Sequence, residues 1–471
     1  MHEMWAQEEV GQAHLGHAAR TKRLVQLVQE LAAHPAESVP QACQEWAATK
    51  GAYRFWDNAH VEAAAIRQAQ SESTLARCQG QELILAIQDT TDVDYRTHPA
   101  TTGLGHLQGK RTKGKLPQGL KVHSVLAVSQ QGVPLGVVFQ QVWVREEELV
   151  SAEEEVHRRY RSIEEKESGR WLVAQRAIQE LFEPGQRVLT LADREADLYA
   201  LFAQPRPVGK ELLIRARHDR RLQTEDHSEA THLWERIRQT PATVIVAFEV
   251  PRTHEHKARS TTLAIRFATL TIAPPAPRKT HAVWKPLLIQ VVMAEEVEPP
   301  EGETPVSWLL LTTMPVTSME EAVQVVLWYR LRWLIERFHF VLKSGCRIEQ
   351  LQLATMQRLE RALATYGIVA WRLLWLTYEA REAPDASCEV LLQKEEWQAL
   401  YATIHQTLIL PEQPPSLHEV VGWIARLGGF LARTSDGEPG VKVIWRGLRR
   451  LDDIIATWHL LHPSHFPTSF G

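Results

Sequence analysis

The sequence lacks the features of several protein classes. It has four cysteines, Cys43, Cys78, Cys346 and Cys388, and none of them belongs to a CxxC pair. This argues against a disulfide framework and a structural zinc site, and it fits a reducing compartment. No run of 18 apolar residues occurs, and the N-terminal stretch has no apolar signal core. We therefore expect a soluble, intracellular chain with no membrane partner.

A surplus of positive charge is missing as well, because the formal net charge is −4. A nucleic-acid partner would thus have to be held by local basic patches. We find no repeat of fixed period and no low-complexity segment. With 471 residues, 44% of them hydrophobic, the chain can bury a large core and is expected to hold two to four structural units.

The N-terminal region is helical by its periodicity. Leucine and valine residues recur at helical spacing over residues 18–33, and His34-Pro35 ends this segment. A second short helix is expected near "PQACQEWAA". Two short helices with basic and aromatic residues could form a helix-turn-helix-like DNA contact unit. A small helical cap on a larger domain is the alternative.

The middle of the chain reads as α/β. "ELILAI" is a short strand that ends near Asp89, and "RVLTLA" is a strand followed directly by Asp193. The segments on either side of "SQQG" predict a β-hairpin. Residues 210–314 alternate like strands and indicate a β-rich insertion, and helices are expected from 318 to the end of the chain.

Three acidic residues occupy positions where they could bind a metal ion or a ligand. Asp89 and Asp193 follow strands, and carboxylates at such positions point into the crevice where α/β proteins bind ligands. Together with Glu336 they would form an oxygen-ligand set suited to Mg²⁺ or Mn²⁺. Each acid also has an ordinary structural explanation, as a turn, a helix cap or a surface ion-pair partner.

The segment 318–343 predicts one long helix, with a capping box at Ser318 and Glu321 and a terminator at Gly345. Phe340 offers Glu336 no ion-pair partner one turn later. At about 100° per residue, one stripe of this helix carries an acid, two cations and a phenol: Tyr329, Arg332, Glu336 and Lys343. Cations beside a metal-binding acid suit a site that also holds phosphate groups.

The spacing Tyr329-x₂-Arg332-x₃-Glu336-x₆-Lys343 resembles the Y-R-E-K signature of cut-and-paste DDE transposases of the insertion-sequence-four family, transposon-five type. "IQDTT" and "DREADLYAL" resemble the segments that carry the first and second catalytic Asp of that family. "HSVL", "EKESGRWL", "GETPVSWLLLT", "WIARLGGF" and the N-terminal "ARTKRLVQLVQELA…GAYRF" also have counterparts, in the same order. The resemblance therefore covers nearly the whole chain.

This resemblance implies an RNase H-like α/β core with a mixed β-sheet and a β-strand insertion, flanked by N-terminal and C-terminal helical regions. It implies that Asp89, Asp193 and Glu336 are catalytic and hold two Mg²⁺ ions, or Mn²⁺. Tyr329, Arg332, Lys343 and Arg215 would bind DNA phosphates near the active site. The implied reaction is strand cleavage at the element ends, hairpin formation and joining of the 3′ ends to target DNA.

Further DNA contacts are expected from local charge and from the resemblance. Basic side chains cluster in "GKRTKGKLPQGLK" and "LLIRARHDRRL", and Trp308 could stack on an extruded base. A solvated loop or strand edge is the alternative for the basic segments, and a core position is the alternative for Trp308. The DNA-binding candidates outside the active site are Arg20, Arg23, Lys50, Lys121 and Trp308.

We expect a DNA-end-binding domain at residues 1–72, a catalytic domain at 73–380 and a helical dimerisation region at 381–471. The expected partners are terminal-repeat and target DNA and a second copy of the chain, in the cytoplasm at the bacterial nucleoid. Two alternatives stay open: an inactive DNA-end-binding inhibitor or remnant, and a metal-dependent nuclease without strand transfer.

Overall fold

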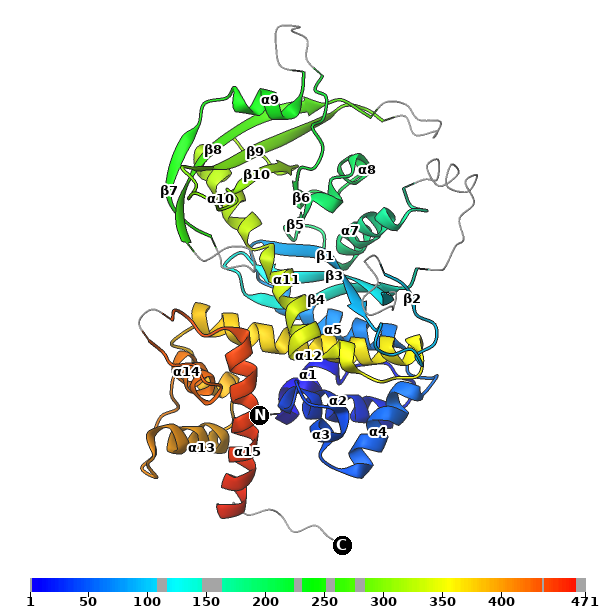
Figure 1. Ribbon diagram of the computed structural model, residues 1–471, viewed down its shortest axis with the longest axis vertical. Coiled ribbons are helices and arrows are strands. Elements are labelled where there is room, and N and C mark those ends of the chain that lie inside the picture. The colour runs from blue at the N-terminus through cyan, green and yellow to red at the C-terminus, as the bar shows by residue number, and fades with distance from the viewer. Residues whose placement is uncertain are drawn as a thin grey trace.

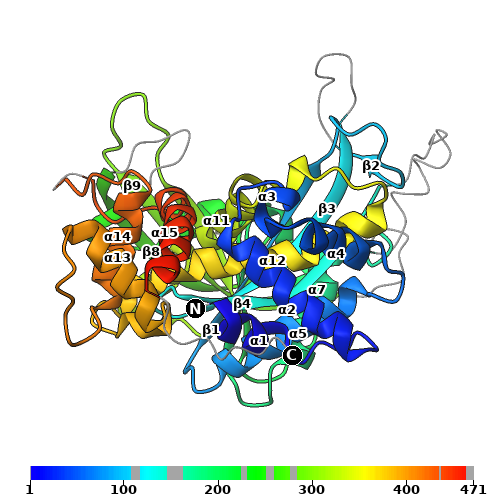
Figure 2. The ribbon, with the colours of Figure 1, turned by 90° about the horizontal axis from the view of Figure 1, so that it is seen from below.

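The computed structural model describes residues 2–107, 117–145, 163–223, 231–250, 259–275, 284–433 and 436–462. A twisted mixed β-sheet forms the upper part of the molecule in Figure 1, and the N-terminal and C-terminal helices gather below it. In Figure 2 the C-terminal helices lie on the left, beside the N-terminal helices. None of the described helices is long and apolar enough to cross a lipid bilayer.

The core of the sheet has the strand order β4-β3-β1-β5-β6. Strands β1, β3 and β4 are antiparallel neighbours, whereas β5 pairs in parallel with both β1 and β6. This confirms the predicted RNase H-like core and the predicted hairpin. The elements of this part are β1 (Ile84–Asp94), β2 (Gly105–His106), β3 (Gln118–Ser129), β4 (Pro134–Trp143), η1 (Glu167–Gly169), α7 (Arg170–Leu181), β5 (Val188–Ala192), η2 (Arg194–Ala196), α8 (Tyr199–Ala203) and β6 (Lys210–Arg215).

The β-strand insertion extends the same sheet beyond β6, in the order β10-β9-β8-β7, with every added strand antiparallel to its neighbour. The expected limits of 210–314 include β6, which pairs in parallel with β5 and is therefore a core strand. The inserted elements are α9 (Leu233–Arg238), β7 (Thr243–Val250), β8 (Arg259–Ile272), β9 (Leu287–Val297) and β10 (Ser307–Thr312).

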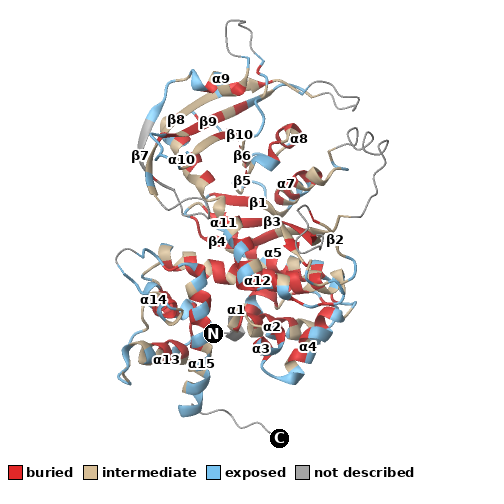
Figure 3. Cartoon of the chain, in the orientation of Figure 1, coloured by how far each residue is buried: buried red, intermediate tan, exposed pale blue. Residues whose placement is uncertain are grey.

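One hydrophobic core joins the helical regions to the sheet. It contains buried residues of the N-terminal helices, of one sheet face, of α12 and of the C-terminal helices, and Figure 3 shows these buried segments facing one another. The expected domain boundary at 72/73 lies inside α5. The flanking helices are α1 (His2–Val10), α2 (Ala18–Ala33), α3 (Val39–Cys43), α4 (Trp46–Asp57), α5 (Ala63–Cys78), α12 (Met356–Glu382), η5 (Cys388–Val390), α13 (Lys394–His405), α14 (Leu417–Leu427) and α15 (Val441–Leu461).

The segment 318–345 is not the single helix that its periodicity predicts. Helix α10 (Met319–Arg330) ends in a tight turn, because the amides of Leu331 and Arg332 bond to carbonyls three residues back, at 2.9 and 3.0 Å. Helix α11 (Trp333–Phe340) follows and runs into a π-helical turn, η3 (Val341–Gly345), and a 3₁₀ turn, η4 (Ile348–Gln350). The predicted capping box at Ser318 and Glu321 is present.

Candidate active site

Asp89 lies on β1, and Asp193 directly follows β5, the parallel neighbour of β1. The pairing of β1 with β5 runs from Ile84↔Val188 to Ile87↔Leu191, an offset of 104 residues. The same offset relates Asp89 to Asp193. The prediction that β1 ends at Asp89 is wrong, since the strand continues to Asp94, whereas Asp193 does follow β5 directly. The sheet itself thus brings the two acids together.

The sheet face that carries these acids is the one covered by α11. Side chains alternate between the faces of a strand, so Asp89 shares a face with Leu85 and Ile87. Those two side chains belong to the same core cluster as Leu334 and Ile335 of α11, and α11 contacts β1. Glu336 is therefore carried by the helix that covers both acids.

The charges of the three acids interact. Burial first, and then the charge of Asp193, raise the pKa of Asp89 to about 7, and Glu336 adds to this rise. Arg332 and the Thr90 amide act in the opposite direction. The Thr90 amide donates to Asp89 Oδ1 at 2.7 Å, and the Glu195 amide donates to Asp193 Oδ1 at 2.8 Å.

Glu336 does have an ion-pair partner, contrary to what Phe340 at the following turn indicates. Arg332, one turn earlier, donates to its carboxylate. Burial lowers the pKa of Arg332, but Tyr329, Glu336 and Asp89 outweigh that effect and raise it. Within the described residues no three His, Cys, Asp or Glu side chains are grouped closely enough to hold a metal ion as they stand. In this arrangement Glu336 is bound to the Arg332 guanidinium.

A phenol and a second guanidinium border the acids. Tyr329 is 3% exposed, and burial raises its pKa to about 12. Arg215, on β6, donates to the Ser307 carbonyl at 2.8 Å and feels the charges of Tyr329 and Asp193. Trp308, half-buried on β10, meets the Tyr329 ring edge-to-face at 5.2 Å between ring centroids. The structure thus places Tyr329, Arg215 and Trp308 near one another.

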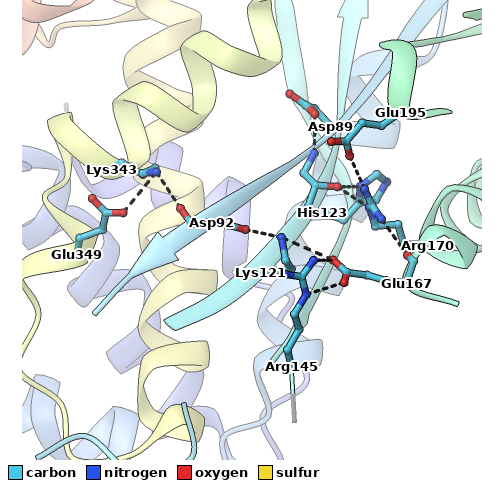
Figure 4. Close-up of polar contacts among 11 residues, drawn as sticks. Asp89, Asp92, Lys121, His123, Arg145, Glu167, Arg170, Glu195, Lys343 and Glu349 are labelled. Atoms are coloured by element: carbon cyan, nitrogen blue, oxygen red, sulfur yellow. Dashed lines mark hydrogen bonds and ion pairs between the residues drawn. The ribbon is translucent and has the colours of Figure 1, made fainter. Parts of the chain in front are cut away.

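Lys343 and Lys121 contact a different part of β1 (Figure 4). Lys343 Nζ donates to the Asp92 carbonyl at 2.8 Å and lies 3.4 Å from Glu349. Lys121 Nζ bonds to the Asp92 carboxylate at 2.6 Å. The stripe of a straight helix would place Lys343 beside Glu336, but the π-turn places it over Asp92 instead.

The N-terminal candidates differ in their surroundings. Arg23 forms two hydrogen bonds to Glu30, both 2.9 Å, and one to the Ala48 carbonyl at 2.7 Å, so it ties α2 to α4. Arg20 donates to the Leu15 carbonyl at 2.8 Å. Lys50 on α4 is exposed. Of the three, Lys50 has the solvent access that a phosphate contact needs.

Some predicted DNA contacts are paired elsewhere or lie outside the described residues. Arg220 forms an ion pair with the fully buried carboxylate of Asp197, which also accepts the amides of Arg217 and His218. Outside the described residues lie Lys110, Arg111, Lys113, Lys115 and most of the acidic run at 145–155.

The sequence reasoning missed Arg170 and His123. Arg170 begins α7 within "EKESGRWL", and His123 lies in "HSVL" on β3. Both motifs support the family resemblance, but neither has a spacing that indicates a role. Their contacts depend on a strand pairing that only the folded sheet shows.

The residues present fit a divalent cation. Asp89, Asp193 and Glu336 offer only oxygen donors, which is the set that Mg²⁺ and Mn²⁺ prefer. Burial and the charges of Asp193 and Glu336 raise the pKa of Asp89, and a bound cation would offset the repulsion among these acids. A cation that displaced Arg332 from Glu336 would supply the necessary positive charge.

Three family models match this chain. A "Transposase DNA-binding" model matches residues 2–61, a "Transposase DDE domain" model matches 85–372, and a "Transposase Tn5 dimerisation domain" model matches 368–458. The catalytic model alone spans more than half of the sequence. The match of the catalytic model places this chain in the class of DDE transposases. Within it, the chain belongs to the insertion-sequence-four family, Tn5 type.

A solved structure described as "piggyBac transposase synaptic complex with hairpin DNA" also matches. The identity is 10% and the TM-score is 0.29, over 77% of this chain and 62% of that one. The chain thus spans less than two thirds of this relative.

Proposed function

We propose that this chain cuts and rejoins DNA at the ends of a mobile element, using Asp89, Asp193 and Glu336 to hold two divalent cations. The observation that supports this proposal most strongly is that the strand register places Asp89 and Asp193 side by side on the sheet face covered by α11. Membership in the DDE family supports divalent-metal use. When bound, such cations supply activation of a water or hydroxyl nucleophile and stabilisation of the leaving oxygen.

The protein's own part is to position the strand. Arg215, Arg332 and the Tyr329 hydroxyl lie beside the acids, where they can bind phosphate oxygens and fix the backbone for in-line attack. The edge-to-face contact of Trp308 with Tyr329 places an aromatic surface next to these phosphate-binding groups. We propose that a base displaced during hairpin formation stacks there.

The two other matched regions support the proposed partners. We propose that the N-terminal helices bind the terminal repeats, that the C-terminal helices pair two copies of the chain, and that the reaction is cut-and-paste through a hairpin. Expected domain limits of 1–72, 73–380 and 381–471 remain part of this proposal.

The test uses purified protein, a plasmid that carries the element ends, and Mg²⁺. Wild type should nick the ends, form hairpins visible on denaturing gels and join 3′ ends to target DNA. Asp89→Asn, Asp193→Asn and Glu336→Gln should still shift end DNA in a gel but lose nicking. Glu320→Gln, at an exposed acid of α10, is the matched control.

Each alternative has its own outcome in this experiment. A wild-type chain that binds ends and leaves the plasmid intact would be an inactive binder, and cut ends without insertion products would indicate a nuclease. Nicking at the wild-type rate by all three acid variants would refute the assignment of the active site.

A further inference from the structure

The side chain of Arg170 joins the two chain segments that follow Asp89 and Asp193. Its Nε donates to Thr90 Oγ1 at 2.7 Å, and one of its terminal nitrogens donates to Glu195 Oε2 at 2.7 Å. The other donates to the Glu167 carbonyl at 3.0 Å. Figure 4 shows Arg170 between Glu195 and the strand that carries Asp89. We call the contacts to Thr90 and Glu195 the Arg170 bridge.

Both partners in the Arg170 bridge also hold an acid. The Thr90 amide donates to Asp89 Oδ1, and the Glu195 amide donates to Asp193 Oδ1. Each partner therefore bonds to Arg170 through its side chain and to a carboxylate through its backbone. A displacement of either segment would move one carboxylate relative to the other.

The pairing of β1 with β5 does not by itself fix the spacing of these two segments. The pairing of β1 with β5 ends at Ile87↔Leu191, two residues before the acids. The two neighbouring carboxylates carry like charges, and their repulsion acts to separate the segments that hold them. A guanidinium that bonds to both sides opposes that separation, and its planar array of donors can reach two acceptors at once.

Arg170 lies away from the DNA side of the site. Thr90 points to the opposite sheet face from Asp89, because neighbouring strand residues alternate. Its Cα partner across the ladder is His123, whose Nδ1 lies 2.9 Å from Thr90 Oγ1. The three guanidinium nitrogens of Arg170 bond to Thr90, Glu195 and the Glu167 carbonyl, so they are directed at these partners and not at a phosphate beside the acids.

Packing holds Thr90 and Arg170 in place. The buried His123 ring lies 3.1 Å from Gln88 Oε1 and meets Trp171 edge-to-face at 4.8 Å between centroids. The guanidinium of Arg170 lies over the same Trp171 ring at 5.2 Å. Thr90 Oγ1, by accepting from Arg170 Nε, can direct its own proton to His123 Nδ1. This network leaves the bridge little freedom to move.

We propose that Arg170 is a positioning residue that fixes the separation of Asp89 and Asp193, and thereby sets the affinity of the site for divalent cations. This inference rests on the proposed function. Residues that orient metal ligands without touching the metal typically change affinity by about 10–100-fold when they are replaced.

The test is a titration of the full chain with Mn²⁺, followed by electron paramagnetic resonance, for wild type, Arg170→Lys and Arg170→Gln. Lysine keeps the charge but cannot span both partners, so both variants should bind Mn²⁺ about 10-fold or more weakly than wild type. Their melting temperatures and gel shifts with DNA should stay close to those of wild type. Arg176→Gln is the matched control, since Arg176 lies on the same helix in an exposed pair with Glu164.

A second pair of variants keeps the inference testable if Arg170 variants fail to fold. Thr90→Val removes the hydroxyl that accepts from Arg170 and should weaken Mn²⁺ binding, whereas Thr90→Ser should restore it. Wild-type Mn²⁺ affinity in both Arg170→Lys and Thr90→Val would overturn the positioning role alone. If Asp193→Asn binds Mn²⁺ with the same isotherm as wild type, the proposed function is overturned, and the role of Arg170 is overturned with it.

Discussion

The guanidinium of Arg332 bonds to the carboxylate of Glu336, one turn apart, at the acid cluster that is proposed to bind metal. Arg332 also feels the charge of Asp89 and is only 16% exposed. A fixed positive charge thus lies among acids that a divalent cation would need. A DNA phosphate offers the guanidinium another partner, so binding of DNA and binding of metal should favour each other.

Replacing Arg332 by glutamine should free Glu336 and remove a charge that repels cations. We expect Arg332→Gln to bind Mn²⁺ about 10-fold more tightly than wild type when DNA is absent. Added end DNA should tighten metal binding to wild type but much less to the variant. Arg337→Gln, at an exposed position of α11, is the control. Unchanged or weaker metal binding by Arg332→Gln would show that the ion pair with Arg332 does not keep Glu336 from binding a cation.

His339 on α11 should make the fold sensitive to acid. Burial, and then the charge of Lys343, lower its pKa from 6.5 to about 3, and its Nε2 has no hydrogen-bond partner among the residues that the structure describes. A lowered pKa contributes stability that is present above pH 6.5 and is lost as the pH falls from 6.5 toward 3. At pH 5 the loss from this group is about 2 kcal/mol.

His339→Leu should therefore flatten the decline in the free energy of unfolding between pH 7.5 and pH 5, measured by urea denaturation. Burial lowers the pKa of His123 in the same direction, so part of the decline will persist. His60→Gln, at an exposed position, should leave the decline unchanged. An equal decline in wild type and His339→Leu would mean that His339 does not stay neutral in the fold.

Substitution of Arg23 should affect stability, whereas substitution of Lys50 should affect DNA binding. Arg23→Ala removes two hydrogen bonds to Glu30 within α2 and the one to the Ala48 carbonyl that ties α2 to α4, and it leaves the half-buried Glu30 without its ion-pair partner, so it should lower the melting temperature. Lys50→Ala should keep the melting temperature, weaken binding of end DNA and reduce the slope of log affinity against log salt by about 1. A loss of DNA affinity in Arg23→Ala without a loss of stability would assign it to DNA contact instead.

Sequence periodicity was sufficient to predict a helix or strand whose limits depend on neighbouring residues alone. Helix α2 has the predicted limits, 18–33, because its leucine and valine stripe and the His34-Pro35 stop are both local. The strand β5, with Asp193 directly after it, was likewise readable from an apolar run. The approach of Asp89 to Asp193 follows from the register of two strands about a hundred residues apart, which no local pattern contains.

The course of α10 and α11 could not be read from the sequence. Its apolar residues keep helical spacing through Leu331 and Arg332, although the backbone there forms a tight turn. The π-turn then adds a residue to the helical turn that carries Lys343. The segment packs against the sheet and α12, and a count of 100° per residue includes neither irregularity, so it misplaces Lys343 relative to Glu336.

Gly345, which ends the π-turn, lies against the C-terminal helix α15. A Cβ at this position would lie 2.8 Å from Cζ3 and 3.0 Å from Cε3 of Trp445, a buried ring that cannot swing aside as a flexible chain end would. Phe340 stacks on the same Trp445 ring at 6.1 Å between centroids. The dimerisation region therefore contacts the turn that positions Lys343 over Asp92.

Gly345→Ala should push the π-turn away from Trp445 and draw Lys343 from the Asp92 carbonyl. We expect the free energy of unfolding to fall by about 1–3 kcal/mol and nicking to slow, while binding of end DNA stays intact. Gly422→Ala in α14, where an added Cβ meets nothing within 4 Å, should be neutral or slightly stabilising. Combining Gly345→Ala with Trp445→Leu should restore part of the nicking rate, because the smaller side chain makes room for the new methyl group. If Gly345→Ala behaves like Gly422→Ala in both measurements, the contact with Trp445 does not constrain the turn that carries Lys343.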